Sequence, residues 1–158
     1  VLTIAGIFLI ASSIFRLYKN YQYWGRLTFN KQFQKEWIDL QKWAKKKTAK
    51  DSLFIVPVDK YGFRLYSQRS IVGDFKDGAS CLYHPSLYLN WRQRMRDLGV
   101  EEEMVEGAFL FGYQEIKEKE KINKVAERYQ ADYLVSSFND LNLSKVYNNN
   151  KYSVYQLK

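Results

Sequence analysis

The first fifteen residues carry no charged side chain, which sets them apart from the rest of the chain. The stretch VLTIAGIFLIASSIF is followed at 16–27 by RLYKNYQYWGRL, where basic residues alternate with Tyr and Trp. Aromatic and basic residues directly beyond an apolar run are typical of a membrane interface. We therefore predict that residues 1–19 are the end of a transmembrane helix, that 20–30 are an interfacial linker, and that 31–158 form a soluble domain. Residues 1–24 would make the membrane contact.

Two other interpretations of the apolar run remain open. Fifteen helical residues span about 22 Å, which is short of a hydrocarbon core of about 30 Å. The run could be the apolar region of a signal peptide, although a basic segment before it is lacking, or a helix buried in a soluble core. The chain starts at Val1 and not at Met, from which we expect it to be a fragment of a longer protein or a processed chain. The basic flank favours a cytoplasmic domain, but the positive-inside rule compares both flanks of a span.

From residue 30 onward, apolar residues alternate between helical spacing and short β-branched runs. Helical spacing predicts helices at 30–48, 84–99 and 113–130. The β-branched runs predict buried strands at 53–58, 70–74 and 131–137, with a short helix or turn at 60–68 and a hairpin at 143–157. The segment 101–112 is ambiguous. We predict an α/β fold: a three-layer, Rossmann-like, mainly parallel sheet with a C-terminal antiparallel hairpin.

Polar residues follow the predicted strands. Asp59 follows the first strand, Asp74 the second, and Ser136, Ser137 and Asn139 the third. In open α/β sheets, ligands bind beyond the carboxyl ends of the strands. Together with three basic residues nearby in sequence (Arg64, Arg69 and Lys76), these side chains could form a polar pocket for a sugar or a phosphate. The alternative, which we favour, is that Asp59 and Asp74 cap turns and pair with the basic residues.

Composition and missing motifs narrow the possible chemistry. The net charge of +8 fits an anionic partner, but the basic residues are dispersed and no nucleic-acid-binding motif is present. One Cys and one His cannot form the usual zinc site, and we predict no metal. The sequence contains no glycine-rich phosphate loop, which argues against a nucleotide enzyme, and no cofactor is expected. His84 and Cys81 are interpreted as loop residues.

The segment EWIDLQKWAKKKTAKDSLFIVPVDKYGFRLYSQRSIVGDFKD resembles the C-terminal soluble domain of multi-pass membrane proteins related to the GT-C glycosyltransferases. The matching positions are two Trp, a Thr-containing link, a D-x-x-G-type turn and an aromatic/Arg segment: Trp37, Trp43, Thr48, Asp59, Gly62, Phe63, Arg64, Arg69 and Asp74. The resemblance implies an extracytoplasmic domain whose metal- and lipid-sugar-binding carboxylates lie upstream of this chain. The W-W-D-Y-G turn of oligosaccharyltransferases is matched only loosely by PVDKYG, so its peptide-reading role is not transferred.

Three functions are consistent with these patterns. The first is a non-catalytic domain of a polytopic membrane protein, which supports glycosyl transfer or recognises a glycan or peptide acceptor. Its partners would be the membrane and the upstream transmembrane region, with no nucleic acid. The second is a stand-alone enzyme with a polar site at the strand ends. The third is a membrane-tethered module that binds anionic partners.

Overall fold

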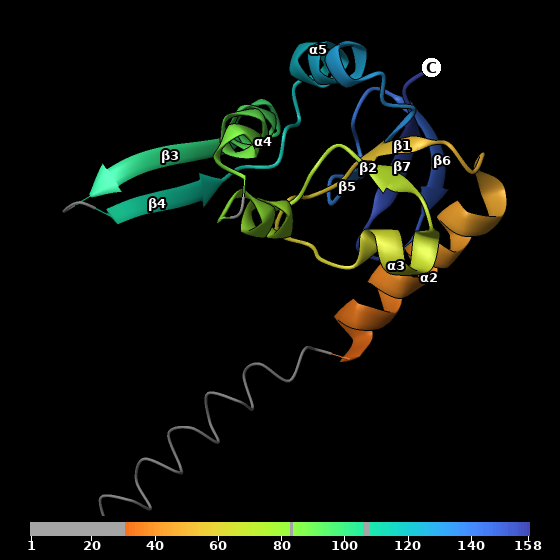
Figure 1. Ribbon diagram of the computed structural model, residues 1–158. Helices are drawn as coiled ribbons and strands as arrows, with labels where there is room; N and C mark the ends of the chain where they lie inside the picture. Colours follow the sequence, from red (N-terminus) through yellow and green to blue (C-terminus); the bar gives the residue numbers. More distant parts are fainter. Residues whose placement is uncertain (1–30, 83, 106–107) are drawn as a thin grey trace, which may run out of the picture. The chain divides into compact units, whose positions relative to one another are not determined.

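The computed structural model of the protein describes residues 31–82, 84–105 and 108–158 (Figure 1). The chain divides into two units between Lys35 and Glu36, and the architecture below is that of Glu36–Lys158. Within the described residues, no helix is both long and apolar enough to cross a membrane. The predicted end of a transmembrane helix at 1–19 and the linker at 20–30 lie outside those residues.

Five strands form one mixed sheet in the order β2-β1-β5-β7-β6. Their bounds are β1 Leu53–Ile55, β2 Ser70–Ile71, β5 Tyr133–Ser136, β6 Ser144–Asn148 and β7 Ser153–Gln156. β1 pairs in parallel with both β2 and β5, whereas β7 pairs antiparallel with β5 and with β6. Four strands therefore run in one direction and β7 in the other. The predicted α/β class, with a mainly parallel sheet and a C-terminal antiparallel hairpin, is confirmed.

The first two parallel strands are shorter than predicted. β1 ends at Ile55, before Pro57, which has no N–H to donate to a neighbouring strand. The apolar run nevertheless stays buried through Val58, whose carbonyl accepts a hydrogen bond from the Phe75 N–H at 3.1 Å. The expected strand at 53–58 is therefore a short ladder followed by a buried extended segment, and it still delivers Asp59 to the carboxyl edge of the sheet.

One face of the sheet is covered by α2 (Lys31–Lys47) and the short helix α3 (Phe63–Ser67). Trp37 of α2 packs on Phe63 of α3 with ring centroids 5.6 Å apart, and on Tyr152 at 5.1 Å. Phe54 of β1 lies against Phe63 at 5.1 Å, which joins the two helices to the sheet. The tilted ring pairs add to the burial of large apolar surfaces and fix how the layers meet.

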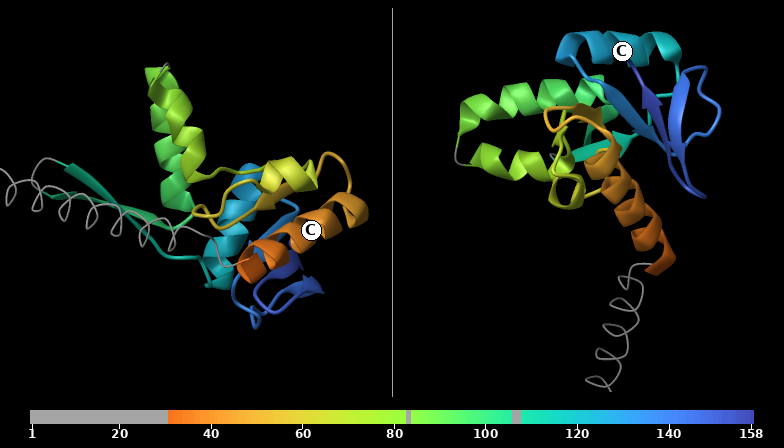
Figure 2. Two further views of the ribbon diagram at one scale, coloured as in Figure 1. Left: turned by 90° about the horizontal axis from the view of Figure 1, so that it is seen from below. Right: turned by 90° about the vertical axis from the view of Figure 1, so that its right-hand side faces the viewer.

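The opposite face is covered by α4 (Pro85–Asp97) and α5 (Lys119–Tyr129). Figure 2 shows α5 and α2 on opposite sides of the strands. The core on this side is a single cluster that includes Ile55, Val58, Trp91, Met95, Ile122, Leu134 and Tyr155. Leu134 lies in this cluster, whereas Tyr133, its neighbour along β5, stacks on Phe54 at 4.9 Å, as side-chain alternation along a strand requires.

The ambiguous segment at 101–112 is a second sheet, a hairpin of β3 (Val100–Val105) and β4 (Ala108–Tyr113). Val100 pairs with Tyr113 at its base. Gly99 precedes the hairpin with φ +93°, and a Cβ there would lie 2.2 Å from the carbonyl oxygen of Gln114. Only glycine permits this conformation and this close approach of two backbones. The left-handed backbone at Gly99 therefore ends α4 and lets β3 begin at Val100.

Arg69, immediately before β2, is buried against the C-terminal end of α2. Its guanidinium donates to the carbonyl oxygens of Lys45 and Thr48, each at 2.7 Å, and to the Thr48 hydroxyl at 3.1 Å. The last carbonyls of a helix have no intrahelical donors, so a buried cation satisfies them and also complements the helix dipole. Arg69 thereby links the first helix to the second strand.

Replacing Arg69 with Ala should lower the free energy of unfolding by about 3 kcal/mol. The change removes charge-assisted hydrogen bonds and leaves buried carbonyls without donors. Urea unfolding followed by circular dichroism would measure the loss. The control is Lys50→Ala, an exposed position that should change stability by less than about 0.5 kcal/mol. Equal effects of the two changes would show that Arg69 does not hold α2 in place.

Candidate functional site

A shallow groove between α3 and the 3₁₀ helix η1 (Phe75–Leu82) brings together three of the six predicted site residues. Arg64, Asp74 and Lys76 line it, together with Gly62, Phe63, Leu65 and Asp77. The groove lies beyond the carboxyl ends of β1 and β2, which is where α/β sheets place ligands. Three of the candidate residues therefore meet at one edge of the sheet, as the order of the predicted strands led us to expect.

Arg64 and Asp77 form the central ion pair of this groove. The two terminal nitrogens of Arg64 donate to the two carboxylate oxygens of Asp77 at 2.9 and 2.8 Å. Asp74 Oδ2 lies 3.7 Å from Arg64, so one guanidinium neutralises part of two carboxylates. This two-pronged geometry is the strongest form of the arginine–carboxylate contact.

The two aspartates also close the turn that starts η1. Asp74 Oδ1 accepts the Asp77 N–H at 3.0 Å, and Asp77 Oδ2 accepts the Asp74 N–H at 3.2 Å. This reciprocal pairing across three residues is a capping box, which satisfies backbone donors at the start of a helix. The Asp74 carbonyl accepts the Trp91 indole N–H at 3.1 Å. Both carboxylates therefore serve backbone structure as well as facing the groove.

Burial makes Asp74 the most perturbed acid of the groove. Its side chain is 6% exposed. Desolvation and the neighbouring Asp77 carboxylate raise the pKa of Asp74, while the Asp77 N–H and Arg64 oppose that rise. A carboxyl whose pKa is higher in the folded than in the unfolded state binds its proton more tightly when folded. Its protonation therefore supports stability fully below pH 3.8, and that support is lost as pH rises through the raised folded value.

The other three predicted residues lie elsewhere. Asp59 is exposed and pairs with its neighbour Lys60 at 2.7 Å. Arg69 is buried against α2 and does not line the groove. Asn139 accepts a hydrogen bond from the Ser153 hydroxyl at 2.7 Å, in the loop after β5. The six residues therefore do not share one pocket, because Arg69 points toward the end of α2 and the loops after β1 and β5 direct their polar groups to local partners. The geometry of Asp74 fits the alternative that we favour, since its carboxylate accepts the Asp77 N–H and lies 3.7 Å from Arg64.

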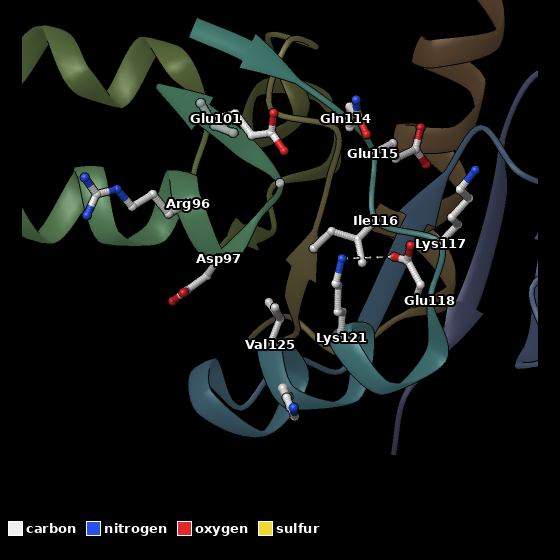
Figure 3. A pocket seen from close by; sticks show the side chains of 13 residues that line it. Arg96, Asp97, Glu101, Gln114, Glu115, Ile116, Lys117, Glu118, Lys121 and Val125 are labelled. Carbon is white, nitrogen blue, oxygen red and sulfur yellow. Dashed lines mark ion pairs between the residues drawn. The ribbon is translucent and has the colours of Figure 1, made fainter. Parts of the chain in front are cut away.

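A second hollow, of about 350 Å³, lies where α4 ends, the hairpin begins and α5 starts. Figure 3 shows Ile116 and Val125 beside the facing pair Lys121 and Glu118, whose charged atoms are 3.7 Å apart. Its lining carries four acidic and four basic side chains: Asp97, Glu101, Glu115, Glu118, Arg96, Lys117, Lys121 and Lys124. The charges balance, so the hollow does not favour one sign of ligand.

Two carboxylates of this second hollow hold neighbouring elements together. Asp97 accepts the Tyr129 hydroxyl at 2.6 Å and pairs with Arg128 at 3.0 Å. Burial and that hydrogen bond raise the pKa of Tyr129 to about 12, so the phenol remains a donor well above neutral pH. Glu115 accepts both the N–H and the hydroxyl of Ser137, at 2.8 and 2.6 Å. These contacts join α4 to α5 and the end of the hairpin to β5.

Within the described residues, no three or more His, Cys, Asp and Glu side chains are grouped closely enough to hold a metal ion. The groove offers instead a cation, Lys76, beside the Arg64–Asp77 pair. A small anion could contact Lys76, but it would have to compete with Asp77 for Arg64. Hydroxyl groups could donate to the carboxylates without breaking that pair, so the arrangement is better suited to recognising a hydroxylated ligand than to binding phosphate.

Sequence reasoning missed Asp77 as a member of the groove. Asp77 is not among the candidate residues that follow the predicted strands, yet it receives the guanidinium of Arg64. The spacing D-x-x-D at Asp74–Asp77 is the signal that could have identified it, because a capping residue and its partner lie three positions apart. Gly78 has its own requirement: a Cβ there would lie 2.8 Å from the Trp91 ring.

The pKa of Asp74 provides a direct test of this arrangement. In a carbon-13 titration, the Asp74 carboxyl should have a midpoint above 3.8. Asp77→Asn should lower that midpoint, because it removes a neighbouring negative charge, and Arg64→Ala should raise it by removing a positive one. Asp59→Asn is the control and should leave it unchanged, since Asp59 is exposed and paired with Lys60. A higher Asp74 midpoint in Asp77→Asn, or a lower one in Arg64→Ala, would contradict the proposed contacts of this cluster.

Comparison with known protein families gives a match to part of the chain. Residues 35–98 match the model of a family described as a domain of unknown function (DUF6798). No curated protein and no solved structure matches the chain. The matched segment runs through α2, β1, α3, β2, η1 and α4, so it contains Arg69 and the Arg64–Asp74–Asp77 cluster, and its description assigns no activity to them.

Proposed function

We propose that residues 31–158 are a non-catalytic α/β domain held beside a membrane by the apolar segment that precedes it. The apolar run at 1–15 and the aromatic and basic flank at 16–27 support this attachment. The parent protein would be polytopic and similar to the GT-C glycosyltransferases and oligosaccharyltransferases. The domain would lie on the extracytoplasmic side, and support glycosyl transfer or recognise a glycan or peptide acceptor.

The observation that carries this proposal is how the charged residues at the sheet edge are engaged. Arg64 is taken up by Asp77, Asp74 and Asp77 cap the same turn, and Asp59 pairs with Lys60. A catalytic acid or base needs a partner poised toward substrate, whereas these groups are directed toward each other and toward backbone amides. Their geometry favours a structural or recognition role.

The finer architecture belongs to the same proposal. The sheet has helices on both faces, and three neighbouring strands, β2, β1 and β5, run parallel. This combination fits a three-layer, Rossmann-like arrangement. In that arrangement the groove beside Asp74 would be the recognition site. Its Arg–carboxylate pair could read hydroxyl groups of a glycan through directed hydrogen bonds.

A stand-alone enzyme is the second candidate, and one observation favours it. Asp74 is buried beside Asp77 and its pKa is raised, which is a property of catalytic acids. An acid that works at neutral pH needs a pKa of about 7. The titration of Asp74 therefore separates the candidates: a midpoint near neutrality favours the enzyme, and a midpoint that stays close to the usual carboxyl range favours the structural role.

Membrane attachment is tested by alkaline carbonate extraction of membranes that contain the full chain. We expect the chain to stay in the pellet, because an inserted apolar helix resists carbonate. Placing Arg at Ile7 and Ile10 should move it to the supernatant, since each charge at a helix centre costs about 3 kcal/mol of insertion. The control Ile7→Leu/Ile10→Leu should remain in the pellet. Release of the unmodified chain by carbonate would contradict the proposed attachment.

A further inference from the structure

The outer sides of α2 and α3 form one surface of cations and exposed apolar groups, here called the α2–α3 surface. It consists of Lys42, Lys45 and Lys46 on α2 and of Tyr61, Leu65 and Tyr66 in and before α3. Leu65 is 70% exposed, Tyr61 55% and Tyr66 45%. Lys42, Lys45, Lys46, Leu65 and Tyr66 line a common shallow groove, so the two kinds of side chain are adjacent.

Packing on the inner side forces these residues outward. Trp37, Leu40 and Ala44 bury one face of α2, which leaves Lys42, Lys45 and Lys46, at i, i+3 and i+4, on the opposite side. In α3, Phe63 and Ser67 are buried, so Leu65 and Tyr66 between them point to solvent. Arg69 bonds the C-terminal carbonyls of α2 from the segment that follows α3, which keeps the two halves of the surface together.

The charge of this surface is uncompensated. Within the described part of the chain, no carboxylate lies within 4.0 Å of Lys42, Lys45 or Lys46. Asp39, one turn before Lys42, and Asp51, beyond the helix end, are the nearest acids in sequence. They are outnumbered by the five lysines at the C-terminal half of α2 and just after it: Lys42, Lys45, Lys46, Lys47 and Lys50. The surface therefore attracts anions.

We propose that the α2–α3 surface docks on the headgroup layer of an anionic membrane. Leu65, Tyr61 and Tyr66 would enter the headgroup region, and Lys42, Lys45 and Lys46 would contact lipid phosphates. Exposed apolar and aromatic groups rimmed by lysines are the combination that binds such an interface. The inference deepens the proposed function and rests on it, because the apolar segment at 1–15 would keep this surface close to a bilayer.

The test uses the full chain reconstituted in vesicles. A nitrobenzoxadiazole fluorophore is attached at Leu65→Cys in a Cys81→Ser background, and iodide quenching reports whether the label is shielded by lipid. We expect shielding and a blue-shifted emission with phosphatidylcholine mixed with phosphatidylglycerol, and an exposed label with phosphatidylcholine alone. The same label at Asn123→Cys, an exposed position of α5 on the other face of the sheet, should stay quenchable in both.

Charge reversal separates specific docking from net charge. K42E/K45E/K46E should lower the ratio of docked to undocked protein by more than about 100-fold, since loss of each basic residue near an anionic surface costs about fivefold and each new glutamate adds repulsion. K119E/K121E/K124E changes three exposed lysines of α5 and the net charge by the same amount, and should leave docking at Leu65 intact. Circular dichroism of each variant checks that it is folded.

Three outcomes would overturn the inference. The first is a Leu65 label that iodide quenches fully in both vesicle types. The second is a Leu65 label that is protected from iodide in both vesicle types. The third is an equal effect of the two charge reversals on docking. The first outcome would point to a protein partner for the surface. Failure of the membrane attachment itself is distinguishable, because it would appear as release of the chain by carbonate, whereas failed docking would appear as an unresponsive label in a chain that stays in the pellet.

Discussion

The contact between Arg69 and the end of α2 is the interaction on which the rest of this arrangement depends. A buried guanidinium usually faces a carboxylate, but Arg69 bonds the carbonyls of Lys45 and Thr48 instead. The Thr48 hydroxyl accepts from Arg69 and donates to the Ala44 carbonyl at 2.7 Å, which extends the contact into the helix. A helix end that would otherwise require water is thereby closed by a residue next to β2.

Two candidate surfaces depend on this contact. The groove with Arg64, Asp74 and Asp77 follows from the position of α3 and the loop after β2, and both flank Arg69 in sequence. The α2–α3 surface requires that the lysines of α2 lie beside Leu65 and Tyr66. One buried cation therefore sets the relative position of a candidate recognition groove and a candidate membrane-docking surface, which gives the family-matched segment at 35–98 a common structural basis.

Periodicity predicted the helices and the parallel strands because their inner faces are continuous in sequence. The β3–β4 hairpin was not predicted, since three consecutive glutamates at 101–103 do not show the alternation of apolar and polar residues that is typical of a strand. The structure explains one of them: the side chain of Glu102 is 6% exposed and paired with Arg92, which lowers its pKa. Because Arg92 lies ten positions away on another element, the local hydrophobic pattern could not predict that Glu102 is buried.

The sequence predicted where the candidate site would lie, but not which side chains would line it. The strand ends predicted that Asp74 and Arg64 lie at one edge of the sheet, and they line the same groove, because parallel strands direct their following loops to one edge. Which side chains point into that edge depends on turn geometry and on partners such as the end of α2 for Arg69 and Ser153 for Asn139. Asp77 lies in the groove because it forms a capping box with Asp74 at the start of η1, and the D-x-x-D spacing is its signal in the sequence.

Arg69 holds α2 and the α3–β2 segment together as one unit. Native-state hydrogen exchange of the full chain, compared between the unmodified protein and Arg69→Met, tests it most directly. We expect that in Arg69→Met the amides near the end of α2 and those of 68–72 exchange faster together, while those of α5 and the β6–β7 hairpin keep their rates. Uniform acceleration across the whole domain, or none at the end of α2, would contradict it.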